Sequence, residues 1–228
     1  MIFDSHGHEG ERVSEESYRR SAWRDRRRAL RHAIRGSFRE LASRWRIRRL
    51  LRTRPELMVE VGAGNKAGAH GWITIDMTAR CDVYWDLRRG LPFPDGSVSR
   101  IYSSHFLEHL SYPEAQVFLD ECLRAMKPGG TFSVCVPNAR IYLEAYVRGT
   151  NLDERHFGYK PAFHGTSRIE YVNYTAYMGG EHKYMFDEEN LIAILRAKGF
   201  QRPRLRAFDP SLDDKDRDFE SIYAEAEK

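Results

Sequence analysis

Three short apolar runs, each ending at a glycine or a carboxylate, constrain the fold of this chain more than any other feature. The first run, residues 57–61, stops at Gly62 and Gly64, the second stops at Asp76, and the third stops at Asp86. They are typical of three successive strands whose ends meet at one edge of a sheet. Ligands of open α/β sheets bind outside the carboxyl ends of the strands. The sequence therefore predicts an α/β fold with a ligand site at that edge.

The residue types at these strand ends suit an adenosine-containing cofactor. A glycine turn lets a ligand approach the backbone because no Cβ stands in the way. The acid after the second strand can accept hydrogen bonds from both ribose hydroxyls, and the acid one strand further on can reach an adenine amino group. A dinucleotide is disfavoured, because its fingerprint has a third glycine and an acid about 20 residues on, whereas Asp76 follows Gly62 too closely. No Gly-Lys-Ser/Thr follows, so a Walker phosphate loop is absent.

Six short motifs occur in order along the chain, and the resemblance that they carry covers roughly residues 56–208. They are Glu60-Val61-Gly62-Ala63-Gly64, Asp76, Asp86-Leu87, Leu91-Pro92-Phe93-Pro94-Asp95, Phe106-Leu107-Glu108-His109 and Leu123-Arg124-Ala125-Met126-Lys127-Pro128-Gly129-Gly130. As a set they resemble the class I S-adenosylmethionine-dependent methyltransferases, in the large group with a type-11 methyltransferase domain. The resemblance implies an α/β, Rossmann-like, seven-stranded and mainly parallel sheet with helices on both faces.

S-adenosyl-L-methionine (SAM) is the cofactor that this resemblance implies. Gly62 and Gly64 would admit its methionine part to the backbone, Asp76 would hold the ribose, and Asp86 with the backbone of Leu87 would hold the adenine. The complete predicted cofactor set is Glu60, Gly62, Ala63, Gly64, Asp76, Met77, Asp86, Leu87, Ser104 and His105.

The remaining pattern predicts the other elements of the domain. Strands are expected over 98–103, 131–136, 204–208 and 221–226, and helices over 113–126 and 188–198, the second with Asp187 as its N-cap. Residues 139–185 are rich in aromatics and histidines and lack clear periodicity. A long connection in a compact domain is usually functional or disordered, and aromatics disfavour disorder. We therefore interpret residues 139–185 as a lid over the substrate.

A hydroxyl acceptor would have to lose a proton, which favours a histidine with a pKa near neutrality. His182 is the first candidate for this base. It lies in Gly180-Glu181-His182-Lys183-Tyr184-Met185-Phe186-Asp187, which resembles a segment of methyltransferases from bacterial polysaccharide and glycan gene clusters. His105, which the resemblance places beside the sulfonium end of the cofactor, is the second catalytic candidate, whereas His109 would pack at a helix start. Substrate-contact candidates are His156, Tyr171 and Tyr174, and for each an alternative role is stacking or hydrogen bonding within the lid. The predicted reaction is O-methylation of a sugar, glycan or other small molecule.

The segment from His105 to His109 also matches His-x-x-Glu-His, a zinc-protease signature. That mechanism requires both histidines on one helix and a third ligand. Here His105 directly follows a predicted strand, and the same residues are explained by the methyltransferase motif. The sequence therefore predicts no metal.

Residues 1–54 form an arginine-rich extension with 16 Arg, no Lys and 7 acids. Their apolar positions recur with helical spacing: Trp23, Leu30, Ile34, Phe38, Leu41 and Trp45. Three alternative roles are consistent with the sequence of such a basic amphipathic helix. In the first it docks on the domain, in the second it lies on an anionic membrane surface, and in the third it binds nucleic acid through its arginines. Residues 19–54 would carry either of the last two contacts.

Length and composition fit one catalytic domain, residues 55–228, with residues 1–54 as an appendage. There is no apolar run of 18 residues and no signal-peptide pattern, and the three cysteines are widely spaced. We therefore expect a cytoplasmic protein, with peripheral membrane association as an alternative.

Two rival functions remain open at this point. An RNA methyltransferase would use the arginine-rich helix as its electrostatic footprint, although no Asn-Pro-Pro-Tyr type motif follows the fourth strand. A non-catalytic partner subunit would keep the fold, although a dead site has no physical need for Asp76, Gly62 and Gly64.

Overall fold

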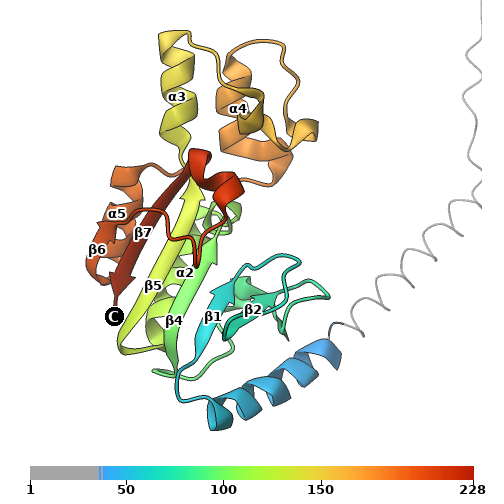
Figure 1. Ribbon diagram of the computed structural model, residues 1–228, viewed down its shortest axis with the longest axis vertical. Coiled ribbons are helices and arrows are strands. Elements are labelled where there is room, and N and C mark those ends of the chain that lie inside the picture. Colours follow the sequence, from blue (N-terminus) through green and yellow to red (C-terminus); the bar gives the residue numbers. More distant parts are fainter. Residues whose placement is uncertain (1–35, 37) are drawn as a thin grey trace, which may run out of the picture. The chain divides into compact units, whose positions relative to one another are not determined.

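The computed structural model describes residue 36 and residues 38–228. The compact unit that contains the sheet comprises Ala42–Lys228. Its seven strands lie in the order β3-β2-β1-β4-β5-β7-β6 (Figure 1). All neighbours are parallel except β7, which is antiparallel to both β5 and β6. The predicted mainly parallel, seven-stranded α/β sheet is confirmed. The strands are β1 Met58–Val61, β2 Trp72–Asp76, β3 Val83–Tyr84, β4 Val98–Ser104, β5 Met126–Pro137, β6 Gln201–Leu205 and β7 Ser221–Glu227.

The register of β1 explains why the predicted strand ends meet. Val61 is paired with Ile75 of β2 on one side and with Ser103 of β4 on the other. The chain builds β2 and β3 outward from β1 in one direction and β4 and β5 in the other, which makes the carboxyl end of β1 a topological switch point. Apolar side chains such as Val59 and Val61 are completely buried and hold this centre of the sheet together.

Two helices form where the sequence predicts them. In α2, Tyr112–Ala125, Ser111 and Glu114 form a capping box at the start, and the helix buries a stripe of apolar residues. In α5, Glu188–Ala197, the Asp187 carboxylate accepts a hydrogen bond from the Asn190 amide at 2.8 Å, which confirms the predicted N-cap.

Residues 139–185 contain two helices that the sequence analysis missed. They are α3 Ala139–Arg148 and α4 Ile169–Tyr177, which pack against each other beyond the carboxyl ends of β4 and β5 (Figure 1). Their shared core is separate from the main core and is built mostly from tyrosine and phenylalanine: Tyr142, Ala145, Phe157, Ala162, Tyr171 and Tyr174. Because tyrosine carries a hydroxyl and also occurs at surfaces, the spacing of these residues did not register as a buried helical face.

The edge strand β6 begins three residues earlier than predicted and ends at Leu205. Arg204 is paired with Glu225 of β7 in the register, and their side chains form an ion pair at 2.6 Å. Arg202 forms a second ion pair with Glu227. These cross-strand pairs fix an otherwise polar strand that has little apolar pattern to reveal it.

A helix over residues 38–53 precedes β1, and its residues 42–53 belong to the compact unit. Ile47 and Leu50 join the main core, and the Ser43 hydroxyl accepts a hydrogen bond from the Tyr84 amide at 2.9 Å. Trp45, by contrast, is 67% exposed. The buried face of this segment is therefore not the predicted face that contains Trp45, and the compact unit begins ahead of the predicted boundary at residue 55.

The predicted apolar positions Trp23, Leu30 and Ile34 lie outside the described residues. Among the helices that the structure does describe, none has the length and apolar character needed to span a bilayer.

Candidate functional site

The glycine turn after β1 folds across the end of β2. Gly62 and Gly64 have backbone φ angles of +67° and +60°, which residues with a Cβ rarely adopt. The amides of Gly62 and Ala63 both donate to the carbonyl oxygen of Ile75, at 3.0 and 3.3 Å. The amide of Gly64 donates to Asp76 Oδ2 at 2.9 Å. The turn and the acid that the sequence singled out are thus one hydrogen-bonded unit.

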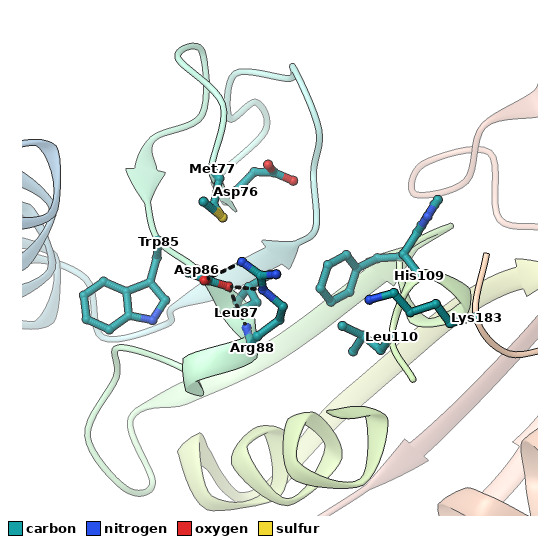
Figure 2. Close-up of a pocket in the computed structure, with 10 residues that line it drawn as sticks. Asp76, Met77, Trp85, Asp86, Leu87, Arg88, His109, Leu110 and Lys183 are labelled. Carbon is teal, nitrogen blue, oxygen red and sulfur yellow. Dashed lines mark hydrogen bonds and ion pairs between the residues drawn. The ribbon is translucent and has the colours of Figure 1, made fainter. Parts of the chain in front are cut away.

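A cavity of about 190 Å³ opens beside this unit. Figure 2 shows Asp76, Met77 and the segment from Trp85 to Arg88 on one side, and His109, Leu110 and Lys183 on the other. The lining residues are Asp76, Met77, Trp85, Asp86, Leu87, Arg88, Phe106, His109, Leu110 and Lys183. Four residues of the predicted cofactor set therefore share one cavity wall, as their place at the strand ends led us to expect.

Asp86 is engaged by a neighbour that the sequence analysis did not consider. It is the N-cap of a 3₁₀ turn, η1 Leu87–Arg89, and Arg88 donates to it from its backbone amide, Nε and Nη2 at 3.1, 2.9 and 2.8 Å (Figure 2). These hydrogen bonds from Arg88 hold the pKa of Asp86 below its usual range. Because a carboxylate has about four acceptor positions, one remains for an adenine amino group.

The two turn glycines differ in the space that they leave. A Cβ at Gly62 would lie 2.2 Å from Phe106 Cγ, whereas no described atom lies within 4 Å of a Cβ built at Gly64. That both glycines admit the cofactor stays a prediction, but their surroundings are not the same. Phe106 fills the space over Gly62, and the open approach to the backbone is at Gly64. An open glycine next to Asp76 and the cavity fits the methionine part of the predicted cofactor.

This difference predicts a difference in stability between two alanine variants. Each variant has the backbone penalty of a left-handed residue, about 1–2 kcal/mol. Gly62→Ala also forces Phe106 to move, which adds about 1–3 kcal/mol. We expect urea unfolding to show Gly62→Ala as the less stable variant by about 2 kcal/mol, and the loss caused by Gly62→Ala to be smaller when it is measured in a Phe106→Ala background. Equal stability of the two single variants would show that Phe106 does not press on Gly62.

Two histidines stand at the far side of the cavity. His109 ends the 3₁₀ turn η2, Leu107–His109, two residues ahead of the Ser111 N-cap of α2, and it lines the cavity. Its packing at a helix start stays a prediction. His182 lies behind His109, with ring centroids 5.1 Å apart and an interplanar angle of 81°. Burial lowers the pKa of His182 and outweighs the opposing effects of the Thr175 carbonyl and Glu108. His182 is therefore a neutral imidazole near pH 7.

Glu108 and His105 are buried beside this pair. Glu108 is 2% exposed, and its Oε1 lies 3.4 Å from His105 Nδ1 and 4.0 Å from His109 Nε2. Burial alone would raise the pKa of Glu108. The imidazoles of His105 and His109 together have a larger, opposite effect, so the pKa of Glu108 is lowered. His105 has a φ of +48° and does not line the described cavity, and neither does Ser104. The catalytic role of His105 stays a prediction.

The other predicted residues have structural partners. Glu60 forms an ion pair with Lys66 at 3.0 Å, and Ala63 is buried. The predicted substrate residues belong to residues 139–185, whose role as a lid stays a prediction. His156 packs edge-on against Phe219, and Tyr171 and Tyr174 lie within the aromatic core there. These contacts account for the burial of all three, and their contact with a substrate stays a prediction.

Five cavity residues were not predicted: Trp85, Arg88, Phe106, Leu110 and Lys183. Sequence signals existed for two of them. Arg88 lies two residues after Asp86, where an N-cap acid bonds to the backbone. Lys183 follows His182 in the segment that returns toward the sheet.

A family model for the methyltransferase domain matches residues 75–134. A probable S-adenosylmethionine-dependent methyltransferase of Mycolicibacterium smegmatis is 44% identical over 57 residues, which are 23% of this chain and 21% of that protein. The match therefore spans about a fifth of this relative.

Solved structures of low sequence identity also align with the chain. A SAM-dependent methyltransferase from Archaeoglobus fulgidus is 18% identical, with 83% of this chain and 94% of that chain covered and a TM-score of 0.49. Haemonchus contortus phosphoethanolamine N-methyltransferase 2, in complex with SAM, is 13% identical, with 81% and 52% covered and a TM-score of 0.49.

Proposed function

We propose that this chain, which belongs to the class I S-adenosylmethionine-dependent methyltransferases, transfers a methyl group from that cofactor to a hydroxyl of a sugar, a glycan or another small molecule. One observation carries the proposal. A single cavity has the acids Asp76 and Asp86 on one wall and an imidazole, His109, on the opposite wall. The first wall suits an adenosine cofactor, and the second suits an acceptor that must lose a proton.

The wall with Asp76 and Asp86, here called the donor wall, needs only to bind and orient the cofactor. When bound, SAM supplies a methyl group already activated by its sulfonium, so the protein mainly aligns donor and acceptor, and alignment alone supplies a large share of the rate. Asp76 would accept hydrogen bonds from the ribose, and the free acceptor position of Asp86 would take the adenine amino group. The open backbone at Gly64 leaves room for the methionine part.

The opposite wall with His109, here called the acceptor wall, favours a hydroxyl acceptor, because an amine is already a good nucleophile and needs no base. In the transfer, the bond between the methyl carbon and sulfur breaks, a bond from the acceptor oxygen to that carbon forms, and the hydroxyl proton must leave. His109 is 38% exposed at its side chain and lines the cavity, so it is the imidazole closest to that proton. His182, the predicted base, lies behind it and acts on the acceptor only through this pair.

Matched acceptors test the proposal. Sugars with free hydroxyls and the corresponding amino sugars with protected hydroxyls are incubated with the full chain and SAM labelled in its methyl group. We expect label in the hydroxyl acceptors, and mass spectrometry should place the added methyl on oxygen. Transfer to the amines alone, or to RNA alone, would contradict the proposed acceptor class and leave the cofactor assignment standing.

A further inference from the structure

Four side chains converge behind the acceptor wall: His105, Glu108, His109 and His182, here called the Glu108 cluster. One ligand atom from each of Glu108, His109 and His182 lies within 4.8 Å of the other two. The backbone amide of Lys183 donates to the carbonyl oxygen of Glu108 at 2.8 Å, which fastens the segment of His182 to the turn that carries Glu108 and His109. The backbone thus holds together three side chains that also contact one another, since the His109 and His182 rings pack edge-on and Glu108 Oε1 lies 4.0 Å from His109 Nε2.

The rings of His109 and His182 are fixed in the same way. Nδ1 of His109 lies 2.9 Å from the carbonyl oxygen of Glu181, and Nδ1 of His182 lies 2.9 Å from that of Thr175. A carbonyl oxygen only accepts hydrogen bonds, so each Nδ1 carries the proton and each Nε2 of the neutral ring has a free lone pair. Histidines that bind metals are oriented in this way, with the second nitrogen donating to a carbonyl or carboxylate.

Glu108 lacks the partners that a buried carboxylate requires. Neither of its oxygens accepts a hydrogen bond from any described residue. Nδ1 of His105 lies 3.4 Å from Oε1 of Glu108. The Ser221 hydroxyl donates to the carbonyl of Arg217 at 2.6 Å, so its oxygen accepts from His105 Nε2 at 2.9 Å. Nδ1 of His105 also has no hydrogen-bond partner among the described residues, so two buried polar groups face each other unpaired.

We propose that the Glu108 cluster binds a divalent first-row transition-metal ion, with Glu108, His109 and His182 as ligands and His105 as a fourth donor. Imidazole with carboxylate suits Zn²⁺, Co²⁺, Mn²⁺ or Fe²⁺, whereas Mg²⁺ and Ca²⁺ prefer an all-oxygen set. Bonds of about 2.0–2.1 Å bring tetrahedral ligands to within about 3.4 Å of each other. The 4.0 Å between Glu108 Oε1 and His109 Nε2 has to shorten by about 0.6 Å, and the other separations, which are within 4.8 Å, by at most about 1.4 Å. The ion also supplies the charge that the buried carboxylate lacks.

The role of the ion, which rests on the proposed methyl transfer, follows from the place of His109 in the cavity wall. A cation there lowers the pKa of a hydroxyl that binds next to it. The Nε2 atoms then hold the ion, and the hydroxyl proton passes to water. Glu108, His109 and His182 act together in this arrangement, and none of them is the base on its own.

The ligand set also explains why the sequence argued against a metal. His105 and His109 do not share a helix, as the protease signature requires, because His105 follows β4 directly. The missing ligand is His182, which is distant in the chain and reaches the cluster only through the fold.

Cobalt binding tests the site directly. Full-length protein without an affinity tag is stripped with a chelator and titrated with Co²⁺ in the absence of SAM, and the visible absorption of nitrogen-ligated cobalt is followed. We expect one equivalent to bind and to be displaced by Zn²⁺ but not by Mg²⁺. Glu108→Gln and His182→Gln should each weaken binding at least about 100-fold.

His156→Gln is the matched control, because His156 is equally buried and its Nδ1 also lies near a carbonyl oxygen, that of Asp153 at 3.1 Å. It should bind Co²⁺ as the unsubstituted chain does, and the ion should raise the Tm of this control but not that of Glu108→Gln. No bound equivalent, unchanged affinity in both ligand variants, or preference for Mg²⁺ would overturn the inference. Cobalt binding without any methyl transfer would contradict the proposed function and leave the ion site standing.

Discussion

Asp76→Ala is expected to weaken SAM binding by more than 100-fold. The carboxylate ends β2 in the cavity wall, and its Oδ2 already accepts from the Gly64 amide, so it orders the turn and faces the ligand at once. A hydrogen bond to a charged group contributes about 1.5–3 kcal/mol, and two ribose hydroxyls would donate to this acid. A loss of about 3 kcal/mol corresponds to more than a hundredfold in Kd.

Titration calorimetry of the variants measures this effect. Glu154→Gln is the control, because the Glu154 carboxylate is 95% exposed and does not line the cavity, so its loss should leave Kd unchanged. Circular dichroism of Asp76→Ala should show an intact fold, since the lost hydrogen bond to Gly64 contributes about 1.5–3 kcal/mol, less than the usual stability of a domain. Binding by Asp76→Ala within threefold of the unsubstituted chain would remove Asp76 from the cofactor site.

Asp213→Ala is expected to lower the free energy of unfolding by about 3–5 kcal/mol, the usual effect of breaking a buried ion pair from one side. The Asp213 side chain is completely buried and accepts from Tyr102 Oη at 2.9 Å, from Arg206 Nη2 at 2.7 Å and from the Asp209 amide at 2.7 Å. Its removal leaves the guanidinium of Arg206, only 11% exposed, without its carboxylate. Because Tyr102 belongs to β4, the loss affects the centre of the sheet.

Urea unfolding of single and double variants separates the loss of the Asp213 hydrogen bonds from the effect of the uncompensated Arg206 charge. Arg206→Met should restore much of the stability of Asp213→Ala, because it removes the uncompensated buried charge. Asp95→Ala is the surface control: Asp95 is 82% exposed in its ion pair with Arg124, and its loss should cost under about 1 kcal/mol. A double variant no more stable than Asp213→Ala would show that the orphaned charge is not the cause.

The ends of β1, β2 and α5 could be predicted because local chemistry determines them. An apolar run stops at Gly62, another stops at Asp76, and Asp187 caps the helix that follows it. Each signal lies within a few residues of the feature it predicts. That Asp76 and Asp86 line one cavity could be anticipated for the same reason, since parallel strands bring their ends to one edge.

The features that escaped prediction depend on contacts between distant residues. No local sequence pattern indicates that Phe106 lies over Gly62 or that His182 lies near Glu108. In the helix before β1, Ile47 and Leu50 are buried and Trp45 is not, because the core of the sheet and not helical spacing selects the face. Contact of residues 19–54 with a membrane or a nucleic acid stays a prediction.

The most direct test of the account is a calorimetric titration of the full-length chain with SAM and with its demethylated product, alongside NAD⁺ and ATP. The cavity between Asp76 and His109 should bind SAM and its product at one equivalent with micromolar affinity, and it should bind neither NAD⁺ nor ATP. A folded chain that binds neither SAM nor its product, or that prefers NAD⁺, would contradict the assignment of this cavity.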